Sequence, residues 1–253
     1  MTTAEQRSRT RLSTGHAVTL PLELSLAMGG VVVPARRSRL EAILPDGLSS
    51  LAIAPGIGCV ALVGIQYHRV GRSERDATGL EPYDEFAVII PAVYGSRTNV
   101  PLAQLADGEI GGYVHWLPVT TEPAVALGRE LWGYPKERTA VTVTDGPNGV
   151  RAVVSGGRYG NRETVRLEVS RPQASVRDRD WTLASYTTKA GTLLRTPVQI
   201  QGDAAIGIGP SVGTTLEVPP DLTRELGLWR RPLARLYGSR VRARLLEGER
   251  MTE

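Results

Sequence analysis

Apolar residues along this chain occur mainly in short runs or at every second position, a pattern that is typical of β-strands. Residues 139–170 alternate in this way on both sides of an Asp-Gly-Pro-Asn-Gly turn and predict a meander of strands. In the last predicted strand, Arg240, Arg242 and Arg244 alternate with apolar residues, which indicates one wet face. The other predicted strands lie at 18–34, 59–67, 85–94, 112–118 and 181–200, and the last at 233–246.

The clearest helix signal precedes a proline-rich turn. Thr120 or Thr121 supplies the N-cap, an acidic residue and a proline follow in the first turn, and the helix is expected to end near Gly133. Pro135 cannot continue a helix, so Lys136 is predicted to begin the next strand. Two shorter helices are predicted, one over 36–44 and one over 221–227 with Asp221 as its N-cap.

These elements predict a mainly antiparallel β fold of the α+β class, built as a barrel with a few helices. Residues 1–17 are predicted to form a flexible N-terminal arm, and residues 18–253 a single domain. A chain of 253 residues is long enough to bury most of its apolar surface in one core.

The composition narrows the classes of function. No apolar run approaches the roughly 20 residues that a membrane span needs, and the polar start of the chain lacks the apolar segment of a secretory signal, so we expect a cytoplasmic protein without a membrane partner. The pI near 9.4 arises from scattered arginines, which argues against a nucleic-acid partner. Cys59 is alone, and His16, His68 and His115 have no metal-binding spacing, so we expect neither a disulfide nor a metal site.

Lysine is rare in this chain. Of the 30 basic residues 28 are arginines, and only Lys136 and Lys189 are lysines. Arginine stays protonated at any useful pH, whereas a buried lysine can lose its proton and attack a carbonyl carbon. A lysine retained here is therefore a candidate nucleophile, although an exposed lysine without a role explains a single position equally well.

The segment that contains Lys136 carries the strongest motif. Residues 122–136, EPAVALGRELWGYPK, closely resemble the Schiff-base lysine motif of acetoacetate decarboxylases, in which a helix ending in GRE leads to a PK dipeptide. Residues 113–121, YVHWLPVTT, resemble the strand before that helix, and residues 83–91, YDEFAVIIP, resemble the segment that carries the family's catalytic glutamate. The resemblance implies the family's β-barrel or cone, with Lys136 as the amine nucleophile and Glu85 as the acid/base carboxylate.

The residues themselves are compatible with this chemistry. Burial after a proline-set turn is expected to lower the pKa of Lys136, and a free amine that condenses with a ketone gives an iminium, next to which released electrons are delocalised as an enamine. Tyr83 and Glu85 are two apart on a predicted strand and share a face, where they could handle protons together. Alternatively, Glu85 forms an ion pair with Arg129 or Arg138.

Four aromatic residues are candidates for substrate binding. Tyr83 shares a strand face with Glu85, and Trp116 and Trp132 flank the lysine motif and could line its pocket. Tyr237, on the last predicted strand, is a candidate proton donor.

Two features depart from the family. In the decarboxylases a second lysine follows the reactive one and lowers its pKa, an effect of cationic neighbours for which acetoacetate decarboxylase is the standard example, but here Glu137 stands in that position. Either Glu137 points away along the strand, or burial alone must free the amine. The family's active-site arginine near the first core strand is also absent, since residues 22–33 contain none.

The resemblance implies a cofactor-independent lyase that acts on a small keto acid and assembles as a homo-oligomer. The first hypothesis is decarboxylation of a β-keto acid such as acetoacetate through an iminium on Lys136. A second is aldol condensation and dehydration of α-keto acids such as pyruvate by the same lysine. A third is a non-catalytic keto-acid binding protein in which Glu137 keeps Lys136 protonated.

Overall fold

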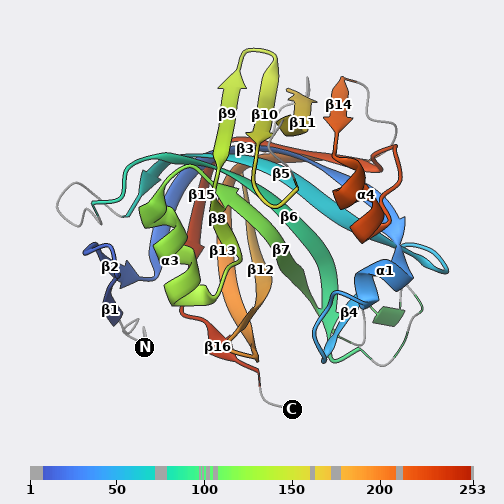
Figure 1. Cartoon of the computed structure of the whole chain (residues 1–253), viewed down its shortest axis with the longest axis horizontal. Helices are drawn as coiled ribbons and strands as arrows, with labels where there is room; N and C mark the ends of the chain where they lie inside the picture. The colour runs from blue at the N-terminus through green and yellow to red at the C-terminus, as the bar shows by residue number, and fades with distance from the viewer. Residues whose placement is uncertain are drawn as a thin grey trace.

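The computed structural model is built around a closed barrel of seven strands (Figure 1). Neighbouring strands in the barrel are antiparallel except β12 and β7, which are parallel, so the prediction of a mainly antiparallel β-barrel is confirmed. In order around the barrel the strands are β6 (Tyr83–Tyr94), β5 (Ile57–Val70), β3 (Leu22–Arg36), β15 (Ala234–Leu245), β13 (Thr192–Ile208), β12 (Asp178–Lys189) and β7 (Glu109–Val119), which pairs with β6 again. The structure describes residues 8–71, 79–96, 98, 100, 103–104, 108–159, 163–171, 178–208 and 213–251.

A second sheet covers the outside of the barrel. It contains the predicted meander, with strands in the order β14 (Thr214–Glu217), β11 (Glu163–Ser170), β10 (Gly149–Ser155) and β9 (Ala140–Gly146). Gly29 of β3 and Gly64 of β5 permit the close approach, because a Cβ atom at either position would lie 2.5 Å from Val150 or Ala152 of β10. The two sheets can therefore pack without a gap.

This arrangement creates separate hydrophobic cores, of which two bear on the site. The first, which we call the barrel interior, includes Leu26, Tyr67 and Leu117. The second, which we call the intersheet core, lies between the barrel and the outer sheet and includes Val33 and Leu167. Because side chains alternate along a strand, neighbouring residues on one barrel strand contribute to different cores.

Short strands complete the sheets at their edges. β8 (Lys136–Arg138) pairs in parallel with β7, β4 (Leu48–Ser50) with β6, and β16 (Glu249–Arg250) with β13. Within the predicted arm, β1 (Ser8–Arg11) pairs with β2 (Ala17–Leu20) and the side chain of Leu12 is buried, so this stretch is folded onto the protein. The division into an arm over 1–17 and one domain over 18–253 stays a prediction.

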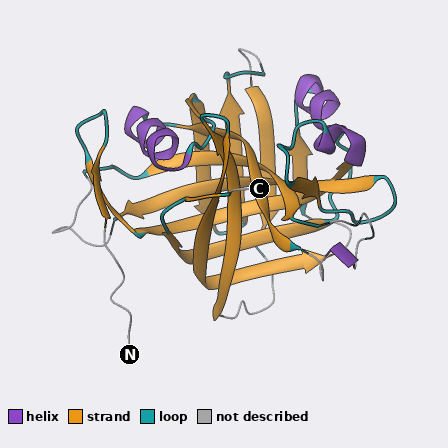
Figure 2. Cartoon of the chain, turned by 90° about the horizontal axis from the view of Figure 1, so that it is seen from below, coloured by secondary structure: helices purple, strands orange, loops and turns teal. Residues whose placement is uncertain are grey.

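Helices lie outside the barrel, with α3 (Glu122–Trp132) on the opposite side of the molecule from α4 (Pro220–Leu226) (Figures 1 and 2). α3 begins and ends as predicted, since the Thr121 side chain accepts a hydrogen bond from Ala124 N and Gly133 adopts a left-handed conformation. The predicted cap of α4 was wrong, because Pro219 holds the N-cap position and Asp221 lies in the first turn. α1 (Arg37–Glu41) is shorter than predicted, and no described helix has the length and apolar character to cross a membrane.

Candidate active site

Lys136 enters the barrel interior from the short connection between α3 and β8. The left-handed turn at Gly133 ends the helix, and Lys136 then pairs with Leu117 of β7, whose side chain belongs to the barrel interior. The Lys136 backbone is held on both sides, because its N–H donates to Tyr134 O at 2.7 Å and its carbonyl accepts from Arg129 Nε at 2.7 Å. The predicted start of a strand at Lys136 is thus confirmed.

The aliphatic part of the Lys136 side chain lies directly over Gly128 of α3. A Cβ atom at position 128 would be 2.5 Å from Cδ and 2.7 Å from Cε of Lys136, which is closer than carbon atoms approach. Glycine at this helical position therefore leaves the space through which the lysine reaches the interior.

The amine of Lys136 meets the two residues that the sequence placed on one strand face. Its Nζ atom is 2.7 Å from Glu85 Oε2, and it donates a hydrogen bond to the Tyr83 hydroxyl at 3.2 Å. Lys136 and Glu85 are only 4% and 3% exposed, so the pair is almost fully removed from water. Neither of the arginines considered as partners of Glu85 fills that role among the described contacts, in which Lys136 does.

Tyr67 completes this group and was not singled out from the sequence. Its hydroxyl donates to Glu85 Oε1 at 3.1 Å, and its ring centroid lies 4.5 Å from that of Tyr83, its direct partner across β5 and β6. One Glu85 oxygen thus faces the amine while the other faces a phenol. Only the register of β5 against β6 would have identified Tyr67, and that register is not evident in the sequence.

The electrostatics of the amine differ from the expectation. Burial alone would lower the pKa of Lys136, but the Glu85 carboxylate and the Tyr83 hydroxyl raise it, and the net result is a pKa above the ordinary value for lysine. Burial also raises the pKa of Tyr83 to about 12 and that of Tyr67 well above its usual range. These shifts favour the ammonium form of Lys136 and the neutral form of both phenols.

Glu137, the acidic residue next to Lys136, points away from the amine, as one of the two alternatives predicted. Its Oε1 atom accepts hydrogen bonds from Trp116 Nε1 at 2.5 Å and from the Arg158 backbone N–H at 3.2 Å. These contacts belong to the intersheet core, in which Trp116 packs edge-on against Tyr159. The carboxylate that raises the pKa of the amine is thus Glu85, from another strand.

The other predicted aromatic residues divide between the two cores. Trp132 lies in the barrel interior, 5.7 Å between ring centroids from Tyr134, and its Nε1 donates to Leu246 O. Trp116 and Tyr237 lie in the intersheet core, because strand alternation turns both side chains that way, and the Tyr237 hydroxyl donates to Asp145 Oδ1 at 3.0 Å. The structure therefore does not bring Trp116 or Tyr237 to the Lys136 amine.

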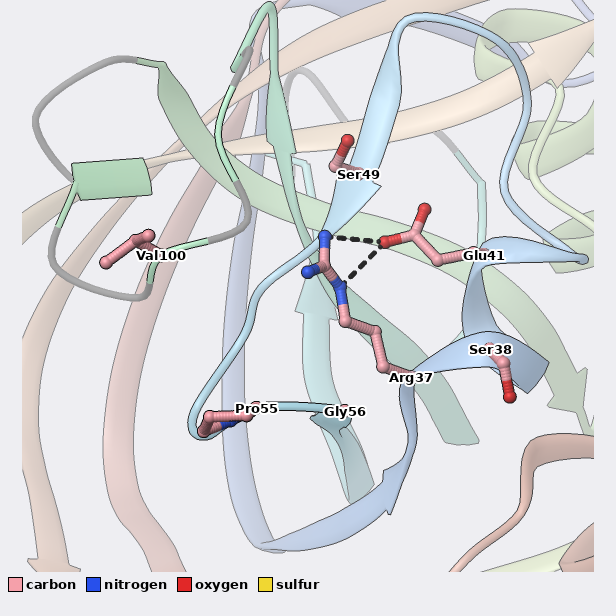
Figure 3. A pocket seen from close by; sticks show the side chains of 7 residues that line it. All are labelled: Arg37, Ser38, Glu41, Ser49, Pro55, Gly56 and Val100. Atoms are coloured by element: carbon pink, nitrogen blue, oxygen red, sulfur yellow. Dashed lines mark hydrogen bonds and ion pairs between the residues drawn. The ribbon is translucent and has the colours of Figure 1, made fainter.

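The pockets on the surface of the described residues include the following two. One, of about 270 Å³, lies at the end of β5 and β6 and is lined by Tyr67 and Tyr83 together with polar residues. The larger one, of about 730 Å³, lies apart from Lys136, and Figure 3 shows the Arg37 guanidinium there paired with Glu41. Within the described part of the chain, no three histidine, cysteine or acidic side chains are placed to hold a metal ion.

Comparisons with solved structures show the same fold. The enduracididine biosynthesis enzyme MppR complexed with pyruvate matches with a TM-score of 0.62 at 16% identity, over 92% of this chain and 90% of that one. Acetoacetate decarboxylase from Legionella pneumophila matches with a TM-score of 0.61 at 15% identity, over 92% and 87%. An acetoacetate decarboxylase-like enzyme from Sphingomonas wittichii RW1 matches with a TM-score of 0.56 at 17% identity, over 91% and 92%.

Sequence comparisons identify the family. Acetoacetate decarboxylase from Bordetella avium is 30% identical over 99 residues, which are 39% of this chain and 34% of that protein. The enzyme from Burkholderia vietnamiensis is 31% identical over 105 residues, or 42% and 33%. The chain thus matches about a third of the length of these curated relatives. The family model described as acetoacetate decarboxylase matches residues 16–198, which is more than half of the sequence, and the chain therefore belongs to the acetoacetate decarboxylase family.

Proposed function

We propose that this protein is a Schiff-base-forming lyase that decarboxylates a small β-keto acid, with Lys136 as the nucleophile and Glu85 as the acid/base group. The observation that carries the proposal is the buried Lys136 amine 2.7 Å from the Glu85 carboxylate, inside a barrel of the acetoacetate decarboxylase family. A buried lysine beside a general base is the arrangement that amine catalysis requires.

The first steps form the imine. Glu85 takes a proton from the Lys136 ammonium along their contact, and the neutral amine attacks the keto carbon to form a C–N bond. A proton passes from the attacking nitrogen to the carbonyl oxygen, which becomes a hydroxyl. This hydroxyl leaves as water when Glu85 returns its proton, which produces the iminium. Burial favours the proton transfer, because it removes two opposite charges that water does not solvate.

Loss of carbon dioxide follows from the iminium. The bond between the α-carbon and the carboxylate breaks, its electron pair moves toward the iminium nitrogen, and an enamine remains. A proton on the α-carbon and hydrolysis of the new iminium release the ketone and regenerate Lys136. Tyr83, 3.2 Å from Nζ and neutral because burial raises its pKa to about 12, is placed to donate or accept hydrogen bonds throughout.

Aldol condensation and dehydration of an α-keto acid is the second candidate. It is favoured by the structural neighbour MppR, which was solved with pyruvate and with the condensation product of pyruvate and imidazole 4-carboxaldehyde. The absence of arginine from residues 22–33 also separates this chain from the decarboxylase pattern. Both reactions pass through an enamine on Lys136. A β-keto acid forms it by loss of carbon dioxide and an α-keto acid by loss of a proton, and the enamine carbon then takes a proton or attacks an aldehyde.

A non-catalytic keto-acid binding protein is the third candidate. The raised pKa of Lys136 favours it, since an ammonium that never loses its proton would bind a carboxylate rather than attack a carbonyl. The amine would then be anchored by Glu85, not by Glu137.

Reductive trapping separates the three candidates. The protein is incubated with acetoacetate or with pyruvate, sodium borohydride is added, and the modified residue is located by peptide mass spectrometry. Lys189→Arg is the matched control for Lys136→Arg, because these are the only two lysines of the chain. We expect an adduct on Lys136 that survives in the Lys189 variant. Release of carbon dioxide then supports decarboxylation, and a condensation product with an added aldehyde supports aldol chemistry. If no adduct forms with either acid, the non-catalytic binding protein remains as the candidate function.

A further inference from the structure

The segment from Tyr134 to Lys136 reaches two different walls of the barrel interior. Lys136 extends to Glu85 on β6, while the Tyr134 hydroxyl donates to Ser185 Oγ on β12 at 3.1 Å. β6 and β12 are separated by β7 in the closed barrel, so the two side chains diverge from a common origin. The charges of Lys136 and Glu85 both influence the pKa of Tyr134, which places its hydroxyl within electrostatic reach of the amine.

The wall that Tyr134 contacts carries a second buried hydroxyl. Thr196 of β13 is the direct cross-strand partner of Ser185, and its side chain is completely buried. Thr196 Oγ1 has no hydrogen bond of normal geometry in the described part of the structure, although it lies close enough to Tyr134 to oppose the rise in that residue's pKa. The neighbouring interior hydroxyl of Thr187 is satisfied, since it donates to Trp132 O.

A buried hydroxyl without a well-formed hydrogen bond indicates a missing partner. Native proteins rarely leave such a group unsatisfied without a reason, because nothing compensates for its lost contacts with water. Here the Thr196 hydroxyl lies in a group of three hydroxyls, together with those of Tyr134 and Ser185. Burial raises the pKa of Tyr134 to about 12, so its phenol stays protonated and can donate.

The charges of the interior define what this group can recognise. Of the residues that the structure describes as buried, Glu85 and Lys136 are the charged ones, and they are paired with each other. A keto acid whose carbonyl carbon meets Lys136 must place its carboxylate nearby, and no described buried arginine can receive it there. Hydroxyl groups are neutral donors that can hydrogen-bond an anion there.

We propose that the hydroxyls of Tyr134, Ser185 and Thr196 form the subsite that binds the carboxylate of a small keto acid while Lys136 takes its carbonyl carbon. This inference rests on the proposed amine chemistry and names how the acid end is recognised. The subsite is small, because a Cβ atom at Gly248 would lie 3.3 Å from Thr196 Oγ1 and 3.6 Å from Trp132 Cδ1. Short acids are therefore the expected ligands.

Neutral donors suit a carboxylate that is to be lost. An ion pair with arginine would stabilise the negative carboxylate of the reactant more than the departing carbon dioxide, and would slow the reaction. Hydroxyl groups orient the carboxylate by hydrogen bonds but stabilise its negative charge less than an arginine would. As its bond breaks, the electron pair flows to the iminium on Lys136 and neutral carbon dioxide leaves the three hydroxyls.

The test compares ligands with and without a carboxylate. Borohydride trapping on Lys136 is measured against concentration for acetoacetate, pyruvate and acetone, in the wild type and in Thr196→Val, which keeps the shape but lacks the hydroxyl. Thr214→Val is the control, because Thr214 Oγ1 is also buried and unpaired but lies on β14 of the outer sheet. We expect Thr196→Val to raise the half-saturating concentration of the two acids about tenfold and to leave acetone unchanged.

Two further readouts keep the outcome decisive. Thr196→Ser restores a hydroxyl and should recover binding of the acids, which a general folding defect would not allow. If Thr196→Val affects acetone as strongly as the acids, or if Thr214→Val has the same effect, the subsite is refuted. If the wild type forms no adduct with any ketone, the proposed amine chemistry is refuted instead of the subsite. Calorimetric titration with acetoacetate then tests the subsite by itself. Thr196→Val must weaken the binding of acetoacetate about tenfold relative to Thr214→Val, or the subsite is refuted as well.

Discussion

Gly128→Ala should displace the amine of Lys136 without unfolding the protein. The new Cβ atom would lie 2.5 Å from Lys136 Cδ, more than 1 Å inside ordinary contact, so the lysine stem has to move by about that distance. Overpacking of this kind costs about 1–3 kcal/mol, whereas alanine in place of glycine inside a helix returns about 1 kcal/mol. A misplacement of about 1 Å at a reacting group lowers the rate roughly 100-fold. Activity should thus fall far more than stability.

A double-mutant cycle isolates the clash. In a Lys136→Ala/Glu85→Gln background the stem is gone and no buried charge remains unpaired, so Gly128→Ala should stabilise the protein by about 1 kcal/mol in urea unfolding. In the wild-type background the same change should be neutral or destabilising by up to about 2 kcal/mol. Equal stabilisation in both backgrounds, or an unchanged trapping rate in Gly128→Ala, would refute the idea that this glycine makes room for the lysine.

Three further predictions concern the neighbours of the amine. Tyr67→Phe removes the donor to Glu85 Oε1, which should favour the neutral pair with a free amine by about 1.5 kcal/mol and speed borohydride trapping at pH 7 about tenfold; slower trapping would contradict this reasoning. Glu137→Gln keeps an acceptor for Trp116 Nε1 and should leave the rate of trapping within about twofold of the wild type. Trp116→Phe removes the donor instead and should lower the free energy of unfolding by about 1–3 kcal/mol. A large effect of Glu137→Gln on the pH dependence of trapping would mean that the charge of Glu137 reaches the amine. The pKa of Lys136 in the folded state is raised above its unfolded value of about 10.4. The contribution of Lys136 to stability should therefore be complete below the unfolded pKa and be lost progressively as the pH rises through the folded pKa. In thermal melts the wild type should thus lose stability relative to Lys136→Met/Glu85→Gln only at alkaline pH.

Local sequence signals were sufficient for much of the site. Thr121 specifies where a helix begins, and Gly133 and Pro135 specify where it ends and where Lys136 emerges. Each acts through its immediate neighbours, so the prediction needed no tertiary information. The pairing of Lys136 with Glu85 followed from the family resemblance, since nothing in the spacing of the two residues requires it.

The remainder depended on registers that the sequence does not encode locally. Tyr67 reaches Glu85 only because β5 and β6 pair in one particular way, and Ser185 meets Thr196 for the same reason. Trp116 was assigned to the pocket from its nearness to the motif along the chain, but the alternation of β7 turned it outward. The pKa of Lys136 was expected to fall because its burial was considered without the distant Glu85 carboxylate, which raises that pKa.

The connection between α3 and β8 limits how this chain can change during evolution. β8 is only three residues long, and its first two residues, Lys136 and Glu137, face different cores. The insertion or deletion of one residue after Gly133 would therefore bury the Glu137 carboxylate in the barrel and turn the Lys136 amine outward. A strand this short has few backbone hydrogen bonds to β7 that could resist a shift of register. The register is held instead by the turn at Gly133 and by the hydrogen bond from Arg129 to the Lys136 carbonyl. The length of this segment is therefore as constrained as the identity of Lys136.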